Sequence, residues 1–214
     1  MGKGKLVIIG AGGLGREVLF LLSYINSRTN YYDISGFIDN TPELQNKIID
    51  GVPILGDDSW LLNYDDDINV VIAVGSSRVR KNIYERFSHK KNICYPNIIA
   101  DDAKYSDTVT FGKGCIIGFY SLLTVNVSIG DFVLLNNYCN IGHDVCIGDF
   151  VTLYGNVNVS GNVTIGSCVE VGVGTRIIQK KSIGENSKVG IGSVVVKNVP
   201  ADCTVFGVPA KRIL

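Results

Sequence analysis

A large apolar residue recurs at every sixth position from residue 111 to residue 195 without a break. The fifteen members of this series are Phe111, Ile117, Leu123, Ile129, Leu135, Ile141, Ile147, Leu153, Val159, Ile165, Val171, Ile177, Ile183, Val189 and Val195. A fixed period over so long a stretch indicates a repeat architecture. Amphipathic helices have a period of 3.6 and strands a period of 2, so neither explains the pattern. The sequence therefore predicts a solenoid whose coil is a triangle with six residues on each side.

Two further positions of each six-residue segment fit this triangle. The residue two places before the recurring one is mostly small or β-branched, as at Cys115, Val133 and Val151, which suits a second inward slot at each corner. Glycine directly follows nine of the fifteen recurring residues, and we expect it at turns that need permissive backbone angles. The coils then stack at strand spacing, roughly 4.8 Å, and each buries its core only against its neighbours.

Residues 1–92 follow a different pattern, in which buried strands alternate with helices. We expect strands at 5–9, 34–38, 52–55 and 69–74, and helices at 16–25 and 79–87. This alternation predicts a parallel sheet with crossover connections. We place the boundary with the repeat between residues 92 and 93, which gives two domains, 1–92 and 93–214.

The first expected strand runs into a GxGxxG motif formed by Gly10, Gly12 and Gly15. In such a turn the backbone N–H groups and the helix N-terminus face a phosphate; a tight turn without a ligand is the alternative. Asp39, at the end of the second strand, is placed to bind a ribose or base, or else is a solvated turn residue. A dinucleotide site needs two such halves and only one fits here. A mononucleotide or nucleotide-sugar is therefore favoured over NAD.

The chain has two histidines, and His143 is the candidate for chemistry. His89 lies in a charged stretch and is expected at the surface. His143 lies two residues beyond the recurring Ile141, on a face that otherwise carries mostly small residues, and Asp144 follows it. A histidine supported in this way can act as a general base near neutral pH. Asn136, near the preceding corner, is placed to hold a substrate hydroxyl or backbone. A surface or subunit-packing role for His143 is the alternative.

Composition and charge exclude several functional classes. The net charge is zero, which implies no general attraction to nucleic acid. No apolar run is long enough to span a membrane, and the N-terminus does not resemble a signal peptide. The six cysteines contain no CxxC pair, so we expect reduced thiols in a cytoplasmic protein. Residues 170–214 carry seven basic and three acidic residues, Lys197 among the basic ones. This excess favours a polyphosphate ligand there, with an ordinary solvated basic surface as the alternative.

Five stretches carry a resemblance to a known family: VIIGAGGLGREV (7–18), GFIDN (36–40), VVIAVGSSRVRKNIYERF (70–87), NNYCNIGHDVCIGDF (136–150) and GVPAKRI (207–213). They resemble the bacterial sugar acyltransferases of the sialic-acid O-acetyltransferase and bacillosamine N-acetyltransferase type. The resemblance implies an α/β N-terminal Rossmann-like domain followed by a left-handed parallel β-helix of hexapeptide repeats. It also implies acetyl-CoA as the donor and a homotrimer with sites between neighbouring helices. The three flat walls of a triangular prism independently favour packing under cyclic symmetry.

The resemblance assigns roles to individual residues. His143 matches the general base, Asp144 its acidic partner, and Asn136 the asparagine that faces the acceptor. The positions that match the nucleotide-sugar site are Gly10, Gly12, Gly13, Gly15, Asp39, Asn40, Gly75 and Ser76. The positions expected to contact the acetyl-CoA are Gly161, Val173, Gly190 and Ile191, together with the basic Lys197. Some relatives have a second histidine close to acetyl-CoA where this chain has Thr152, so the contact there must differ.

We therefore expect an acetyl-CoA-dependent N-acetyltransferase acting on a nucleotide-linked amino sugar, such as a 4-amino-4,6-dideoxy sugar, for surface polysaccharide or glycan synthesis. His143 would take the proton as the amine attacks the thioester directly, with no metal and no acyl-enzyme. O-acetylation of a sialic-acid-like sugar is the runner-up, and a non-catalytic nucleotide-sugar-binding module is a more distant alternative. A β-helix carbonic anhydrase would need three histidines around zinc. An NAD-dependent oxidoreductase would leave the repeat without a role.

Overall fold

The computed structural model describes residues 4–213. By its internal contacts the chain divides into two compact units, Met1–Gly75 with Val79–Ile98, and Ser76–Arg78 with Ile99–Leu214. The chain passes between the units more than once, so the single boundary expected between residues 92 and 93 stays a prediction.

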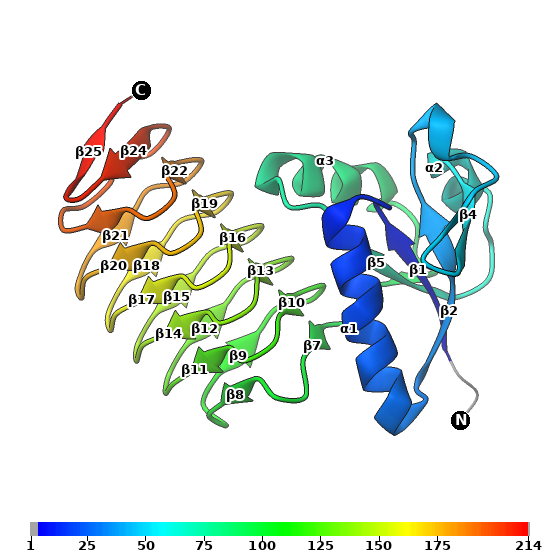
Figure 1. Ribbon diagram of the computed structural model, residues 1–214, viewed down its shortest axis with the longest axis horizontal. Coiled ribbons are helices and arrows are strands. Elements are labelled where there is room, and N and C mark those ends of the chain that lie inside the picture. The colour runs from blue at the N-terminus through cyan, green and yellow to red at the C-terminus, as the bar shows by residue number, and fades with distance from the viewer. Residues whose placement is uncertain (1–3, 214) are drawn as a thin grey trace. The chain divides into compact units, whose positions relative to one another are not determined.

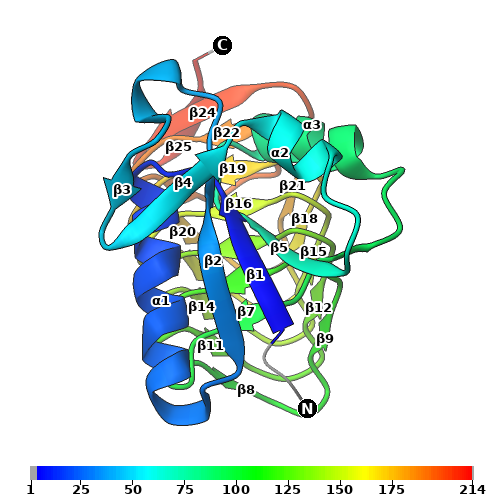
Figure 2. The same cartoon turned by 90° about the vertical axis from the view of Figure 1, so that its right-hand side faces the viewer.

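The first unit is built on a six-stranded sheet in the order β3-β4-β2-β1-β5-β6 (Figure 2). Its strands are β1 (Gly4–Ile9), β2 (Tyr32–Ile38), β3 (Ile48–Ile49), β4 (Val52–Gly56), β5 (Ile68–Ile72) and β6 (Ile93–Cys94). The helices of this half of the chain are α1 (Gly13–Thr29), α2 (Asp58–Leu62) and α3 (Ser77–Phe87), with a 3₁₀ turn η1 (Pro42–Leu44). Every helix within residues 4–213 falls short of the length and apolar character that a membrane crossing demands.

The parallel core of this sheet confirms the pattern expected from the sequence. β1 pairs in parallel with β2 and with β5. Leu6, Val7 and Ile8 of β1 are completely buried, because a strand covered on both faces needs a continuous apolar run. The elements β3, β6, α2 and η1 were not expected, since segments of two to five residues are too short to show a period. A local cap starts α2: the carboxylate of Asp57 accepts a hydrogen bond from the N–H of Ser59 at 2.9 Å.

The second unit is a parallel β-helix of three sheets (Figure 1). One sheet holds β7 (Ile98–Ile99), β10 (Ile116–Ile117), β13 (Leu134–Leu135), β16 (Thr152–Leu153), β19 (Glu170–Val171), β22 (Lys188–Val189), β24 (Thr204–Gly207) and β25 (Ala210–Arg212). The next holds β8 (Lys104–Tyr105), β11 (Leu122–Leu123), β14 (Asn140–Ile141), β17 (Asn158–Val159), β20 (Arg176–Ile177) and β23 (Val194–Val195). The third holds β9 (Thr110–Phe111), β12 (Ser128–Ile129), β15 (Cys146–Ile147), β18 (Thr164–Ile165) and β21 (Ser182–Ile183). Only the closing β24–β25 pair is antiparallel among the pairings described in this unit.

Strands of successive coils pair in a fixed register, for example Leu134 with Thr152 and Leu135 with Leu153. Partners are therefore 18 residues apart, as expected for three segments of six. The recurring apolar residue is the second residue of its strand, and the corner follows it. It is buried in fourteen of the fifteen cases, whereas Phe111 in the first coil is half-buried. The small inward slot is also confirmed, since Cys139 and Val157 are fully buried. Burial raises the pKa of the Cys139 thiol to about 12, so it is an unreactive core residue. Within residues 4–213 no disulfide joins any of the six cysteines.

The glycines after the recurring residues do not have the role expected from the sequence. Left-handed backbone occurs three residues after the recurring position, as at Asn126 (φ 55°), Asp144 (φ 58°) and Asn162 (φ 59°). Asn and Asp tolerate this conformation better than most residues. The glycine is required instead by the close stacking of coils: a Cβ on Gly148 would lie 2.8 Å from the backbone nitrogen of Ser167. The missing side chain makes room for the next coil, not for a turn.

We predict that Gly148→Ala lowers the free energy of unfolding by about 2 kcal/mol, because the added methyl group forces two coils apart. Urea unfolding followed by far-ultraviolet circular dichroism measures this. Gly155→Ala is the matched control, because a Cβ there meets its nearest atom at an ordinary 3.6 Å. Equal losses in the two variants would contradict the stacking explanation.

Candidate functional site

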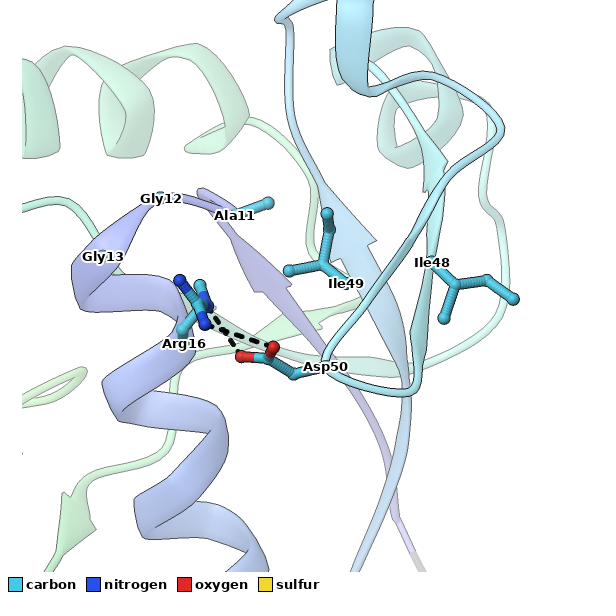
Figure 3. Close-up of a pocket in the computed structure, with 7 residues that line it drawn as sticks. All are labelled: Ala11, Gly12, Gly13, Arg16, Ile48, Ile49 and Asp50. Atoms are coloured by element: carbon cyan, nitrogen blue, oxygen red, sulfur yellow. Dashed lines mark hydrogen bonds and ion pairs between the residues drawn. The ribbon is translucent and has the colours of Figure 1, made fainter.

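A pocket of about 350 Å³ opens in the first unit beside the glycine-rich loop (Figure 3). Its lining residues are Ala11, Gly12, Gly13, Arg16, Ile48, Ile49 and Asp50. The N-cap residue of the 17-residue helix α1 is Gly12, which has no side chain to accept a hydrogen bond from the first turn. The first N–H groups of a helix lack internal partners and favour an anion. The pocket therefore presents an uncapped helix N-terminus to a ligand.

The four glycines of the loop have two different roles. Gly10 has φ +98°, and a Cβ on Gly15 would lie 2.9 Å from the carbonyl carbon of Gly10. Both are therefore required by the turn itself. At Gly12 and Gly13 no atom lies within 4 Å of where a Cβ would be. These two leave the pocket open, so they are the glycines available to a ligand.

Sequence reasoning missed the side of this pocket that faces the glycine-rich loop, where Arg16 and Asp50 form an ion pair. Arg16 donates from Nε to Oδ2 of Asp50 at 2.7 Å and from Nη2 to Oδ1 at 3.3 Å (Figure 3). Asp50 (φ 49°) and Gly51 (φ 82°) form the two-residue turn between β3 and β4. Asp-Gly between apolar residues is the usual sequence of such a hairpin turn, so the sequence did contain a signal for it. The two charged side chains remain 57% and 44% exposed, so Arg16 is accessible to an incoming anion.

Both carboxylate oxygens of Asp39 accept hydrogen bonds from the protein backbone. Its Oδ2 accepts the N–H of Ala11 at 2.8 Å, and its Oδ1 accepts the N–H of Thr41 at 2.9 Å. Partial burial raises the pKa of this carboxyl, but the hydrogen bonds from Ala11 and Thr41 outweigh burial and hold the pKa below its ordinary value. Asn40 is also occupied, since it exchanges two hydrogen bonds with Asp58 at the start of α2. Both side chains thus shape the loops around the pocket.

The loop after β5 is held by Arg80, which sequence reasoning also missed. Arg80 is only 1% exposed. Its Nη1 donates to the carbonyl oxygen of Val74 at 2.7 Å and to that of Gly75 at 3.2 Å. A buried guanidinium satisfied by carbonyls fixes the course of the backbone at Gly75. The next predicted ligand residue, Ser76, is half-buried.

His143 and Asp144 form the corner between β14 and β15. Nδ1 of His143 lies 2.8 Å from Oδ2 of Asp144, and the side chains are 56% and 46% exposed. The hydrogen bond with His143, followed by one from Asn126, lowers the pKa of the Asp144 carboxyl. The carboxylate is therefore ionised at neutral pH and can orient the imidazole.

The neighbouring coils complete this corner with residues that the sequence did not single out. Asn126, 18 residues before Asp144, donates from Nδ2 to Oδ1 of Asp144 at 3.1 Å. Asn162, 18 residues after it, donates its backbone N–H to the carbonyl oxygen of His143 at 2.8 Å. A Cβ on Gly161 would lie 2.5 Å from Cε1 and 2.8 Å from Cδ2 of the imidazole. The ring thus lies over Gly161, which sequence reasoning had placed in the cofactor site. The 18-residue spacing was the available signal for Asn126 and Asn162.

The geometry assigns the proton on His143. A carboxylate accepts only, so Nδ1 must carry the hydrogen that Asp144 receives. In the neutral ring Nε2 is then left with a free lone pair. The amide of Asn162 also lies near Nδ1, with Nδ2 at 3.4 Å, but a ring nitrogen that donates to Asp144 cannot accept there. Nε2 is therefore the atom able to remove a proton from a substrate.

The chain is similar to one known domain family and to several solved structures. Residues 5–87 match the PglD N-terminal domain family. No curated protein sequence matches the chain. PerB from Caulobacter crescentus, solved with CoA and GDP-perosamine, is 28% identical with a TM-score of 0.90 over 99% of this chain and 98% of PerB. The acetyltransferase domain of PglB from Neisseria gonorrhoeae, solved with acetyl coenzyme A, is 29% identical with a TM-score of 0.89 over 99% and 100%. WeeI from Acinetobacter baumannii is 27% identical with a TM-score of 0.88 over 99% and 100%.

The chain is a sugar acetyltransferase of the hexapeptide-repeat type. The resemblance read from the sequence is confirmed, and with it the Rossmann-like domain followed by a left-handed β-helix. These matches set aside the oxidoreductase and carbonic anhydrase alternatives. Among residues 4–213, no three His, Cys, Asp or Glu side chains come together in a way that could hold a metal ion.

The residues predicted to hold the acetyltransferase's cofactor lie in different environments. Val173 and Ile191 are 47% and 64% exposed. Thr152 is completely buried, and its N–H donates to the carbonyl oxygen of Val169. At Gly190 a Cβ would crowd the ring of Phe206, with Cγ at 3.2 Å, so this glycine makes room for that side chain. Surface for a ligand is thus present at Val173 and Ile191.

Lys197 lines a second cavity, of about 310 Å³, at the C-terminal end of the β-helix. Lys211 and Arg212 line the same cavity. The structure therefore brings together three of the seven basic residues counted in the C-terminal stretch. Such a cluster attracts phosphate groups.

Asn136 and His143 lie on successive corners of one coil. The side-chain oxygen of Asn136 accepts the N–H of Asn137 at 2.7 Å, and its own N–H donates to the carbonyl oxygen of Leu153 at 2.9 Å. Within residues 4–213 no hydrogen bond joins Asn136 to His143 or Asp144. The predicted catalytic set is thus split, with only His143 and Asp144 in contact.

We predict that Asp39→Asn destabilises the first unit by about 1–2 kcal/mol at pH 7, because one of two charge-assisted hydrogen bonds is lost. A carboxyl whose pKa is lowered on folding stabilises the fold above its unfolded pKa, about 3.9, and loses this effect as pH falls through the folded value. The difference between wild type and variant should therefore shrink below about pH 4. Urea unfolding followed by fluorescence of Trp60, the single tryptophan, measures it. Asp33→Asn, at an exposed site on β2, the strand that precedes Asp39, should show no such convergence, and a pH-independent difference for Asp39→Asn would contradict the prediction.

We predict that Gly161→Ala displaces the imidazole of His143, because the new methyl group would overlap the ring. Long-range ¹H–¹⁵N spectra of the two histidines measure this: the His143 signals should change and those of His89 should not. Gly155→Ala occupies the same position six residues earlier without a close contact and is the control. Unchanged His143 signals in Gly161→Ala would contradict the placement of the ring.

Proposed function

We propose that this acetyltransferase transfers an acetyl group from acetyl-CoA to the amine of a nucleotide-linked amino sugar. The observation that carries the proposal is the exposed His143–Asp144 pair, which holds an imidazole with Nε2 free to accept a proton. PerB, solved with CoA and GDP-perosamine, and the PglB domain, solved with acetyl coenzyme A, support both substrate classes. A non-catalytic binding module would have no use for the oriented base.

The pocket beside α1 is the proposed site for the nucleotide end of the acceptor. The open backbone at Gly12 and Gly13 and the first turn of α1 suit a diphosphate, and Arg16 adds a positive charge. For acetyl-CoA, the exposed Val173 and Ile191 offer an apolar surface for the pantetheine arm. The cavity with Lys197, Lys211 and Arg212 suits the phosphates of the donor.

The proposed chemical step is a direct transfer. Nε2 of His143 removes a proton from the sugar amine as its nitrogen attacks the thioester carbonyl. The tetrahedral intermediate collapses with loss of the CoA thiolate, which takes up a proton, so the products are an acetamido sugar and free CoA. Asp144 stabilises the positive charge that His143 gains. Holding both substrates in attack geometry would supply most of the rate enhancement.

A homotrimer is the proposed active form. Asn136 and His143 lie on different corners of one prism, so a second copy would most simply complete a site that uses both. Tyr120, Leu122, Val125 and Tyr138 are 43–58% exposed, and the rings of Tyr120 and Tyr138 stack with centroids 5.0 Å apart. Such an apolar surface on a flat wall suits packing under cyclic symmetry. We also propose a cytoplasmic role in the synthesis of surface polysaccharide or glycan precursors.

We predict that His143→Ala lowers kcat for acetyl transfer by about 10²–10⁴-fold, since the general base is lost, while the KM for acetyl-CoA changes little. His89→Ala is the matched control and should retain full activity. Release of CoA thiol, assayed with nucleotide-linked 4-amino sugars and with free and CMP-linked sialic acids, tests the base and the acceptor together. Full activity of His143→Ala would refute the mechanism. Activity on sialic acids alone would replace N-acetylation with the O-acetylation alternative.

A further inference from the structure

The carboxylate of Asp144 has two different partners, one on each oxygen. Oδ2 lies 2.8 Å from Nδ1 of His143, and Oδ1 accepts a hydrogen bond from Nδ2 of Asn126 at 3.1 Å. Asn126 belongs to the preceding coil, and its own backbone N–H donates to Oγ1 of Thr108 at 2.8 Å. The asparagine is therefore anchored on the coil that precedes it and holds the coil that follows.

A carboxylate with only one partner rotates about its χ2 torsion, which is broad for aspartate. Rotation matters here because both groups are at the surface, at 56% and 46% exposure, where water competes for both oxygens. With Oδ1 fixed by Asn126, Oδ2 remains directed at Nδ1. The proton then stays on Nδ1, and Nε2 keeps its lone pair toward the substrate.

Resting on the proposed function of His143 as the base, we infer that Asn126 is a positioning residue for the reaction. It acts through Asp144: it orients the carboxylate, the carboxylate fixes the tautomer of His143, and the tautomer keeps Nε2 basic. Gly161 supports the imidazole from the following coil, because the ring lies on its bare Cα. Three successive coils thus contribute one residue each to the alignment of a single ring.

A purely structural role for Asn126 is the competing explanation. Asn126 lies in left-handed backbone, with φ 55°, where asparagine is favoured whatever its side chain contacts. The β-helix offers a matched case without a histidine: Asn186, with φ 57°, donates from Nδ2 to Oδ1 of Asp202 at 3.1 Å. Stabilisation of a corner by an Asn–Asp pair can therefore be measured separately from catalysis.

The test compares Asn126→Gly with Asn186→Gly, because glycine keeps the left-handed backbone and removes only the side chain. Asn126→Gly should lower kcat by about 10- to 100-fold and leave both KM values within about twofold, whereas Asn186→Gly should keep full activity despite a similar drop in Tm. Asn126→Asp, which keeps size and turn preference but removes the donor, should lose kcat as well. Equal kcat losses in Asn126→Gly and Asn186→Gly would overturn the inference, as would wild-type kcat in Asn126→Gly.

Two further measurements identify the route through Asp144. If Asn126 acts only by orienting that carboxylate, Asn126→Gly should cost little extra in an Asp144→Asn background, because residues that act as a unit are not additive. Long-range ¹H–¹⁵N spectra should show Nδ1-protonated His143 in the wild type and a tautomer mixture in Asn126→Gly, with His89 unchanged. The inference would be overturned if the kcat losses of Asn126→Gly and Asp144→Asn multiplied fully in the double variant. It would also be overturned if the tautomer of His143 were unchanged in Asn126→Gly. Retained activity in His143→Ala would instead refute the proposed function on which it rests.

Discussion

The stacking of one coil on the next, 18 residues further along the chain, is the constraint on which the second unit depends. Backbone hydrogen bonds such as Gly148 N–H to the carbonyl oxygen of Ile165, at 2.8 Å, set the distance between coils. At that spacing nothing larger than hydrogen fits at Gly148 or at Gly142, where a Cβ would lie 2.7 Å from the nitrogen of Gly161. The same spacing brings residues 18 apart into side-chain contact, and this is how Asn126 reaches Asp144.

Corner residues consequently serve backbone geometry and chemistry at once. The left-handed corner favours Asn and Asp, and Asn126, Asp144 and Asn162 occupy equivalent corners of three successive coils. Residues selected for a turn thereby place an amide, a carboxylate and a second amide in one row. In the proposed mechanism, one addition, an imidazole at residue 143, turns this structural row into a general base. The row lies on short corners between paired strands, and such support is more rigid than a long loop would provide.

The sequence predicted the architecture well because the period reflects burial. Recurring residues such as Leu135 and Leu153 are inside because every coil has the same cross-section, so one rule covers the whole unit. The predicted role of Gly148 was wrong, because a glycine looks the same in a sequence whether the backbone needs a positive φ or a neighbouring coil needs room. Arg80 was missed because its partners are backbone carbonyls of the preceding loop, and no sequence pattern marks such a contact. Asn126 was missed although the 18-residue spacing that brings it to Asp144 could be read from the sequence.

The pocket of the first unit shows how occupied side chains limit the interpretation of a motif. Asp39 lies at the strand end where a carboxylate can bind ribose, yet both its oxygens already hold backbone N–H groups of the loops. What the pocket offers a ligand is therefore open backbone at Gly12 and Gly13 and the guanidinium of Arg16. An exposed ion pair contributes little to stability, so little is lost when a phosphate takes Arg16 from Asp50. A diphosphate bound as proposed can therefore draw the guanidinium of Arg16 away from Asp50.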